Sequence, residues 1–366
     1  MRIGGPSGVP GFRALGLFWA TVLGVGVVGA VILQALGPPS PRSARHDVAA
    51  LAVAPAKAPT RPAATRLAAK SDDQPPKPTQ PSPLSARPGR EMPGPIAAPI
   101  PALLEPSKDF PGAALPRIAA DGRTASQVYA RGFDRGGLRP RIAVIVAGVG
   151  LNAADSEDAI RTLPGEITLA VSPYANHPDR LLEAARSTGH EFLMSLPMEP
   201  QSYPLNDAGD HALLTGATPD QNRQRLDWAL TRIAGYAGAT NALGLLRGER
   251  FAGAAAQMDP VLQTLASRGL FYIDARPDQS APQTVWGRAV DLVIDEPAVR
   301  LEIEAKLAQL EQIARDKGSA IGLVGAVRPV TVDRLAAWSN TLAAKGLALA
   351  PASALVREPA LRSAAQ

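Results

Sequence analysis

The chain has 366 residues, a formal net charge of +5 at pH 7 and no cysteine, which excludes disulfides, thiol catalysis and cysteine-ligated zinc. Residues 37–120 carry eleven Lys and Arg against six Asp and Glu, and two Arg precede them. The formal charges of residues 121–366 therefore sum to −2. This distribution argues against a nucleic-acid-binding domain. The basic segment suggests an anionic surface nearby, or its charges serve only to keep it soluble.

Residues 15–36, LGLFWATVLGVGVVGAVILQAL, contain no charged residue. At a rise of about 1.5 Å per residue, a helix of this length crosses a hydrocarbon core of ~30 Å. A cleaved signal peptide is the alternative, but its apolar region is usually about 7–15 residues long. The segment follows Arg2 and Arg13, and it predicts a single transmembrane signal anchor. Residues 1–14 would then form a cytoplasmic tail, with the rest of the chain on the outer side.

Residues 37–120 are rich in Pro, Ala, Ser and basic residues. Nineteen of the 36 prolines lie between Pro38 and Pro116. A segment of this composition has too little apolar periodicity to offset the conformational entropy lost on folding. We therefore predict a disordered linker, which as a random coil would span on the order of 50–60 Å.

Residues 121–356 show apolar runs that alternate with segments of 3.6-residue periodicity, and residues 357–366 form a short C-terminal tail. Alternating strands and helices predict an α/β fold with a parallel sheet, and seven or eight repeats favour its closure into a barrel. The predicted strands are residues 142–147, 167–172, 191–196, 239–244, 270–274, 290–294, 320–325 and 347–351, and the predicted helices include residues 177–188, 219–235, 253–268, 298–317 and 331–345.

The carboxyl ends of parallel strands are where such folds bind ligands. The first strand ends in Gly148-Val149-Gly150-Leu151-Asn152-Ala153, which matches the G-x-G-x-x-A turn of dinucleotide-binding proteins. That motif also needs a carboxylate roughly 20 residues on, at the end of the second strand. Here the second strand ends in Ser172-Pro173-Tyr174, and the next acidic residue is Asp179. The sequence therefore argues against dinucleotide binding.

Six segments around the strand ends carry a resemblance to a known family. They read PRIAVIV, ITLAVSPYA, HEFLMSLPMEPQSYP, GYAGATNALG, RGLFYIDAR and LALAPASAL, and they resemble the divergent polysaccharide deacetylase family. These are envelope proteins of Gram-negative bacteria, related to carbohydrate esterases with a distorted (β/α) barrel. The resemblance implies an anchor in the inner membrane and a folded domain in the periplasm. It also implies removal of an acyl group from an N-acetylated sugar, assisted by a divalent metal such as zinc.

The metal ligands that the resemblance implies are missing from this chain. At each expected position the coordinating or proton-transferring side chain is replaced, so we predict no metal and no cofactor. The four histidines (His46, His177, His190 and His211) show no metal-binding spacing. The replaced positions are Ala147-Gly148 for an Asp-Asp pair, Thr240-Asn241-Ala242 for Asn-Asn-His, Gly325-Ala326-Val327 for Gly-His-Pro, and Ser195 for a histidine.

Three polar residues remain as catalytic candidates: Asp274, Arg276 and Glu199. Asp274 and Arg276 lie two residues apart on one face of a strand end, where they either line a groove or form an ion pair that braces the rim. Glu199 lies between two prolines, in a rigid turn or as a held carboxylate. Tyr174 and Tyr203 are candidates for stacking on a sugar ring. The predicted pocket-lining residues are Ala147, Gly148, Tyr174, Ser195, Pro197, Asn241, Ala242 and Ala326.

The leading hypothesis from the sequence is a membrane-tethered, deacetylase-like domain with a degenerate metal site. It would act in carbohydrate or envelope metabolism by binding a glycan or an envelope partner, with no role for nucleic acid. One alternative is an active metal-dependent deacetylase of N-acetylated sugars with relocated ligands, such as Asp274 and Glu199. Another is a structural scaffold that spans the periplasm through its long linker.

Overall fold

The computed structural model describes Trp19 and residues 94–359. The transmembrane anchor predicted over residues 15–36 lies outside these residues except for Trp19. In the part of the chain that the structure describes, no helix is long and apolar enough to cross a membrane.

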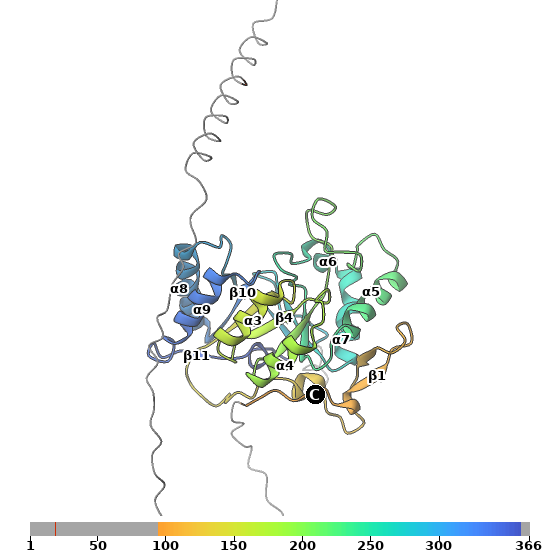
Figure 1. Cartoon of the computed structure of the whole chain (residues 1–366), viewed down its shortest axis with the longest axis horizontal. Coiled ribbons are helices and arrows are strands. Elements are labelled where there is room, and N and C mark those ends of the chain that lie inside the picture. Colours follow the sequence, from red (N-terminus) through yellow and green to blue (C-terminus); the bar gives the residue numbers. More distant parts are fainter. Residues whose placement is uncertain (1–18, 20–93, 360–366) are drawn as a thin grey trace, which may run out of the picture. The chain divides into compact units, whose positions relative to one another are not determined.

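A curled, parallel, nine-stranded sheet forms the centre of the domain (Figure 1). Its strands follow the order β8-β7-β6-β5-β4-β3-β10-β9, and β11 pairs with β3. Each of the eight predicted strands has a counterpart in this sheet, and β8 was not predicted. The strands are β3 (Arg141–Val149), β4 (Thr168–Val171), β5 (Phe192–Ser195), β6 (Gly238–Thr240), β7 (Phe271–Asp274), β8 (Gly287–Ala289), β9 (Leu292–Val293), β10 (Ser319–Val324) and β11 (Ala348–Leu349).

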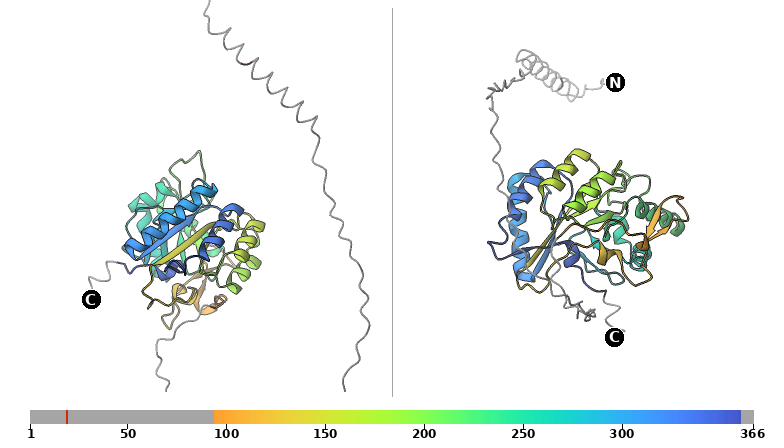
Figure 2. Two further views of the ribbon diagram at one scale, coloured as in Figure 1. Left: turned by 90° about the vertical axis from the view of Figure 1, so that its left-hand side faces the viewer. Right: turned by 60° about the horizontal axis from the view of Figure 1, so that its bottom comes forward.

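Helices surround the curled sheet in both views of Figure 2. They cover it because the strands are apolar on both faces: eight of the nine residues of β3 are buried, as expected for a parallel strand with neighbours on each side. The helices are α2 (Ala125–Val128), α3 (Ala153–Thr162), α4 (Asp179–Ser187), α5 (Pro219–Thr231), α6 (Glu249–Gly253), α7 (Ala255–Ser267), α8 (Arg300–Lys317) and α9 (Pro329–Ser339), with 3-10 turns η1 (Pro101–Leu103) and η2 (Ala352–Ala354).

One continuous segment, residues 287–294, joins the two edges of the sheet. Its first half, β8, pairs with β7, and its second half, β9, pairs with β10. Between the two strands, the N–H of Val290 donates to the carbonyl of Asp274, and the N–H of Asp291 donates to that of Ile321. The parallel sheet therefore curls into a distorted barrel, in which this bent segment takes the place of a regular strand.

The disordered linker predicted over residues 37–120 is wrong for residues 94–120, which pack onto the barrel. Leu103 is fully buried, and Ile96 and Leu115 are nearly so. β1 (Leu104–Pro106) and β2 (Ala114–Pro116) form a small antiparallel hairpin, drawn in orange in Figure 1. The proline-rich composition gave no sign that these few apolar side chains are buried. An extended segment can bury single residues against an existing core without any apolar periodicity in its sequence.

Candidate functional site

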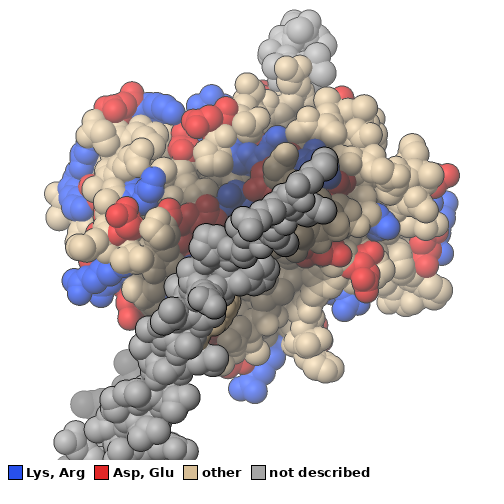
Figure 3. All heavy atoms as spheres, turned by 90° about the horizontal axis from the view of Figure 1, so that it is seen from above, with Lys and Arg blue, Asp and Glu red and all other residues tan. Residues whose placement is uncertain are grey.

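The carboxyl ends of the strands form one face of the domain, the carboxyl-end face, at the top in Figure 1. The loops that follow β5 and β6, together with α6, lie over it. Seen from above, acidic and basic side chains alternate around its middle (Figure 3). In the segments that follow β5 and β6, Arg247 forms salt bridges with Glu249 and Glu296, and Arg250 forms one with Glu199.

Three glycines from three strands meet at the centre of this face. A β-bulge interrupts the pairing of β3 with β4 between Val146 and Val149, and within it Gly148 has a φ of +75°. A Cβ placed on Gly148 would lie 3.4 Å from the Cα of Gly244 and 3.5 Å from the carbonyl oxygen of Gly325. A methyl-sized group would therefore just fit between Gly148 at the end of β3 and the backbones that follow β6 and β10, so the mouth of the barrel is narrow.

Two leucines cover these glycines from the solvent side. A methyl group of Leu151 would lie 3.7 Å from a Cβ on Gly148 and 3.5 Å from one on Gly244. A methyl group of Leu245 would lie 3.0 Å from a Cβ on Gly325. Both leucines remain about half exposed, at 56% for Leu151 and 46% for Leu245. The mouth thus presents an apolar cap to solvent.

The divalent metal that the resemblance implies does not fit the residues at this mouth. Ala147, Ala242 and Ala326 adjoin the converging segments and supply no side-chain donor atom. The nearby carboxylates of Asp274 and Asp295 accept hydrogen bonds from protein groups at both oxygens. Within residues 94–359, no three His, Asp or Glu side chains form a group that could hold a metal ion.

The candidates Asp274 and Arg276 form a bidentate ion pair at the end of β7. The Nε and Nη2 atoms of Arg276 donate to the two carboxylate oxygens at 3.0 and 2.7 Å, and these hydrogen bonds raise the pKa of the guanidinium. Asn241 lies beside the pair, where its side chain donates to the carbonyl of Arg247 at 2.6 Å and accepts from the N–H of Ala275 at 2.7 Å. Asn241 therefore satisfies backbone groups, and the ion pair braces the rim.

Asp295 is a positioning residue that sequence reasoning did not single out. It is buried and directly follows β9, and it accepts hydrogen bonds from the N–H groups of Gly325 at 2.8 Å and Ala326 at 3.1 Å. Asp295 thereby holds the loop after β10 against the mouth. Its position near a strand end was the one feature of the sequence that could have drawn attention to Asp295. The sequence could not identify its hydrogen-bond partners, because they lie about 30 residues away.

Glu199 is a held carboxylate in a tight turn. One oxygen accepts from the N–H and hydroxyl of Thr215 at 2.6 and 2.7 Å, and the other accepts from Arg250 at 3.0 Å. Burial alone would raise the pKa of Glu199, but the hydrogen bonds from Thr215 and the charge of Arg250 outweigh it and keep the pKa below its ordinary value. Glu199 is therefore an anion that clamps two loops together.

Tyr174 joins an aromatic cluster. Its ring centroid lies 5.2 Å from that of Trp228, and the ring of His211 stacks on Trp228 with a centroid distance of 3.7 Å. The Tyr174 hydroxyl accepts from the N–H of His211 at 3.3 Å. Tyr203 lies in the turn after β5, half-buried, and its N–H donates to the carbonyl of Pro200.

The predicted pocket-lining residues are mostly enclosed. Tyr174 and Ala326 are half-buried, and the other six are buried. The hydroxyl of Ser195 is buried with no hydrogen-bond partner in the described part of the chain. The six buried residues are Ala147, Gly148, Ser195, Pro197, Asn241 and Ala242.

A cavity of about 400 Å³ lies beside the Asp274–Arg276 pair, between β7, α7 and the loop of residues 280–284. Two residues that line it, Tyr272 and Thr284, have buried hydroxyl oxygens without a hydrogen-bond partner among the described residues. Burial raises the pKa of Tyr272 well above its ordinary value, so its hydroxyl stays protonated. The lining of this cavity therefore includes a charged pair and two residues whose hydroxyl groups have no hydrogen-bond partner in the described part of the chain.

Comparison with known proteins gives a consistent set of matches. A profile of the family described as divergent polysaccharide deacetylase matches residues 144–356. The chain is 27% identical over 218 residues to an uncharacterized protein of Haemophilus influenzae, covering 55% of this chain and 72% of the relative. It is 25% identical over 230 residues to the protein YibQ of Escherichia coli K12, covering 61% of this chain and 69% of the relative.

A solved structure from Agrobacterium tumefaciens C58, the uncharacterized protein ATU2773, has the same fold. It superposes with a TM-score of 0.62 at 31% sequence identity, over 67% of this chain and all of that chain.

Proposed function

Because the chain belongs to the divergent polysaccharide deacetylase family, we propose that it binds an envelope glycan at its carboxyl-end face without hydrolysing it. The observation that carries this proposal is the narrow mouth, where Gly148, Gly244 and Gly325 approach one another beneath two leucines. Metal-assisted hydrolysis needs an open coordination position for water and a group of ligands around it. Neither fits a mouth closed by backbone and aliphatic side chains.

The cavity beside Asp274 is the place where we propose that a sugar unit binds. Sugar hydroxyls both donate and accept hydrogen bonds, and they match the free hydroxyls of Tyr272 and Thr284. Arg276 lines the same cavity, and its side chain is 18% exposed, so it is available to an acetamido or hydroxyl oxygen. The paired carboxylate of Asp274 orients this guanidinium rather than acting as a base.

We expect the full-length chain, incubated with acetylated chito-oligosaccharides and Zn²⁺, Co²⁺ or Mn²⁺, to bind the sugar and to release no acetate above a metal-free blank. A metal-dependent release of acetate would contradict the proposal and support an active deacetylase with relocated ligands. Calorimetry in the same buffer measures the binding, and an absence of binding to any acetylated glycan would contradict the sugar site.

The unpartnered hydroxyls allow a test that does not disturb the fold. Thr284→Val or Tyr272→Phe removes a buried hydroxyl that makes no hydrogen bond in the described structure, so the free energy of unfolding is expected to stay equal or rise slightly. If each hydroxyl binds the sugar, the loss of one hydrogen bond of about 1 kcal/mol weakens affinity about fivefold. Thr331→Val is the matched control, since its hydroxyl is equally buried and unpartnered but lies on α9. Equal affinities for the sugar in all three variants would exclude this cavity as the sugar-binding site.

We further propose that residues 15–36 anchor the chain in the inner membrane, with the folded domain in the periplasm. The uncharged apolar composition of this segment supports the proposal. The double substitution Leu23→Arg with Val27→Arg should move the protein from the carbonate-washed membrane fraction to the soluble fraction, because each buried charge costs about 2.5–3.5 kcal/mol on insertion. The control, Val48→Arg with Val53→Arg, should leave the protein in the membrane fraction. Wild-type protein in the soluble fraction would contradict the anchor.

A further inference from the structure

The opposite end of the barrel, the amino-end face, holds a cavity with a strongly basic lining. Its volume is about 400 Å³, and it lies where β3 and β10 begin and where the chain leaves η2. Half of its ten lining residues are cationic, although the folded part of the chain as a whole is close to neutral. These five cations are Arg135, Arg141, Arg288, Lys317 and Arg357.

Arg288 forms the floor of this cavity and is 7% exposed. Its guanidinium donates to the hydroxyl of Ser319 at 2.8 Å and to the carboxylate of Asp291 at 2.9 Å. Burial lowers the pKa of Arg288, and the charges of Arg357 and Arg141 lower it further against the opposing effect of Asp291. Arg141 and Arg357 are therefore close enough to Arg288 to repel it.

Asp291 does not neutralise this cluster. Within residues 94–359, it is the only carboxylate that forms a salt bridge with any of the five cations, and it pairs with both Arg288 and Lys317. Five positive charges against one negative charge leave four uncompensated. The side chains of Arg141 and Arg357 make no hydrogen bond or ion pair with other described residues. The carboxyl end of α8 also lies here, but its partial charge of roughly −0.5 is small beside this excess.

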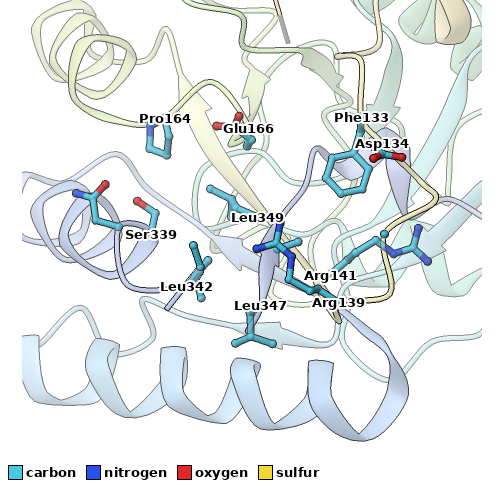
Figure 4. Close-up of a pocket in the computed structure, with 14 residues that line it drawn as sticks. Phe133, Asp134, Arg139, Arg141, Pro164, Glu166, Ser339, Leu342, Leu347 and Leu349 are labelled. Carbon is cyan, nitrogen blue, oxygen red and sulfur yellow. The ribbon is translucent and has the colours of Figure 1, made fainter. Parts of the chain in front are cut away.

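A second cavity of about 330 Å³ adjoins the basic one and shares Arg141 with it. Figure 4 shows the side chains of Phe133, Leu342, Leu347 and Leu349 around it, with Arg139 and Arg141 on one side. The chain enters the described domain at this same end, because Gly94 lies against Gly189 in the turn that precedes β5.

We propose that the basic cavity on the amino-end face is a binding site for a phosphate group. Guanidinium groups bind phosphate oxygens through paired, charge-assisted hydrogen bonds, and two arginines here have unused donors. A phosphate that carries one to two negative charges would relieve the mutual repulsion of Arg141, Arg288 and Arg357. The site lies at the opposite end of the barrel from the proposed glycan cavity, so the two proposals stand independently.

Titration of the full-length chain with inorganic pyrophosphate at low salt tests the site. The test variant combines Arg141→Ala with Arg357→Ala. The side chains of these two arginines make no hydrogen bond or ion pair with other described residues. We expect pyrophosphate affinity to fall at least tenfold, while the melting temperature stays equal or rises slightly because the repulsion of Arg288 is relieved. The control, Arg123→Ala with Arg161→Ala, removes the same charge from two exposed ion pairs and is expected to retain wild-type affinity. Equal loss in both variants would mean a general charge effect and would overturn the proposal.

A second arm distinguishes a soluble phosphate from a lipid headgroup. Flotation with vesicles of phosphatidylcholine, with and without phosphatidylglycerol, measures lipid binding by the same proteins. Stronger binding to phosphatidylglycerol vesicles that the Arg141/Arg357 variant loses and pyrophosphate competes away identifies a lipid headgroup as the source. Pyrophosphate binding without this vesicle effect identifies a soluble phosphorylated ligand. No difference between wild type and variant with either probe would overturn the proposal.

Discussion

Gly148→Asp, which introduces an acidic residue where the family resemblance implies one, is expected to lower the free energy of unfolding by about 3–5 kcal/mol. At a φ of +75°, any side chain costs about 1 kcal/mol or more relative to glycine. The Cβ of the new residue would lie 3.5 Å from the carbonyl oxygen of Gly325. Its carboxylate would be buried without a cation, and an unpaired buried charge costs several kcal/mol. Urea denaturation followed by circular dichroism measures the change.

The matched control for this substitution is Gly216→Asp. Gly216 is exposed, and a Cβ placed there would meet no atom within 4 Å, so the stability should stay within about 0.5 kcal/mol of wild type. If Gly148→Asp were as stable as wild type, or if Zn²⁺ raised its melting temperature, the mouth would have room for a metal. That result would contradict the proposal that the narrow mouth prevents metal-assisted hydrolysis.

Glu191→Ala is expected to have a comparably large effect, about 3–5 kcal/mol, on the free energy of unfolding. Glu191 is fully buried and accepts from the hydroxyl of Thr168 at 2.9 Å, from the N–H of Ser353 at 3.0 Å and from the N–H of Arg131 at 3.0 Å. It also accepts from the hydroxyl of Ser353. Alanine would leave two buried N–H groups unpaired at about 1–3 kcal/mol each, and it would open a cavity as well.

Thermal and urea denaturation of Glu191→Ala should be compared with those of Glu183→Ala. The Glu183 side chain is 72% exposed in its ion pair with Arg186, and a surface pair of this kind contributes at most about 1 kcal/mol. The loss of stability in Glu191→Gln should fall between those of the two alanine variants. The amide oxygen can still accept hydrogen bonds from some of the donors, while the amide nitrogen faces the others and cannot accept. A loss below 1 kcal/mol for Glu191→Ala would mean that water or a rotated side chain replaces the carboxylate.

The two substitutions concern opposite ends of one barrel. Glu191 ties the start of β5 to η2 and to the segment after α2 at the amino end, while Gly148 closes the mouth at the carboxyl end. The barrel is thus held by a buried polar network at one end, and glycine backbones approach one another closely at the other. The two proposed ligand sites lie at the rims, one beside Asp274 and Arg276 and the other beside Arg141 and Arg357.

The strands and most helices could be predicted because their periodicity is local. A run such as IAVIVA is apolar on both faces, and Thr218-Pro219-Asp220-Gln221 contains the cap and first-turn proline that the structure shows at the start of α5. Asp274 and Arg276 could be placed together for the same reason, since residues two apart in a strand share a face. The segment of residues 94–120 could not, because its few buried side chains follow no period.

By itself, the sequence predicted the order of the strands and helices along the chain and the family, because these depend on residue type and short spacing. Only the tertiary structure decided that the backbones of Gly148, Gly244 and Gly325 approach one another, that Glu199 binds Thr215 and Arg250, and that five cations share one cavity. Those contacts join residues far apart in the chain, and they exist only after the sheet curls and brings its strand ends together.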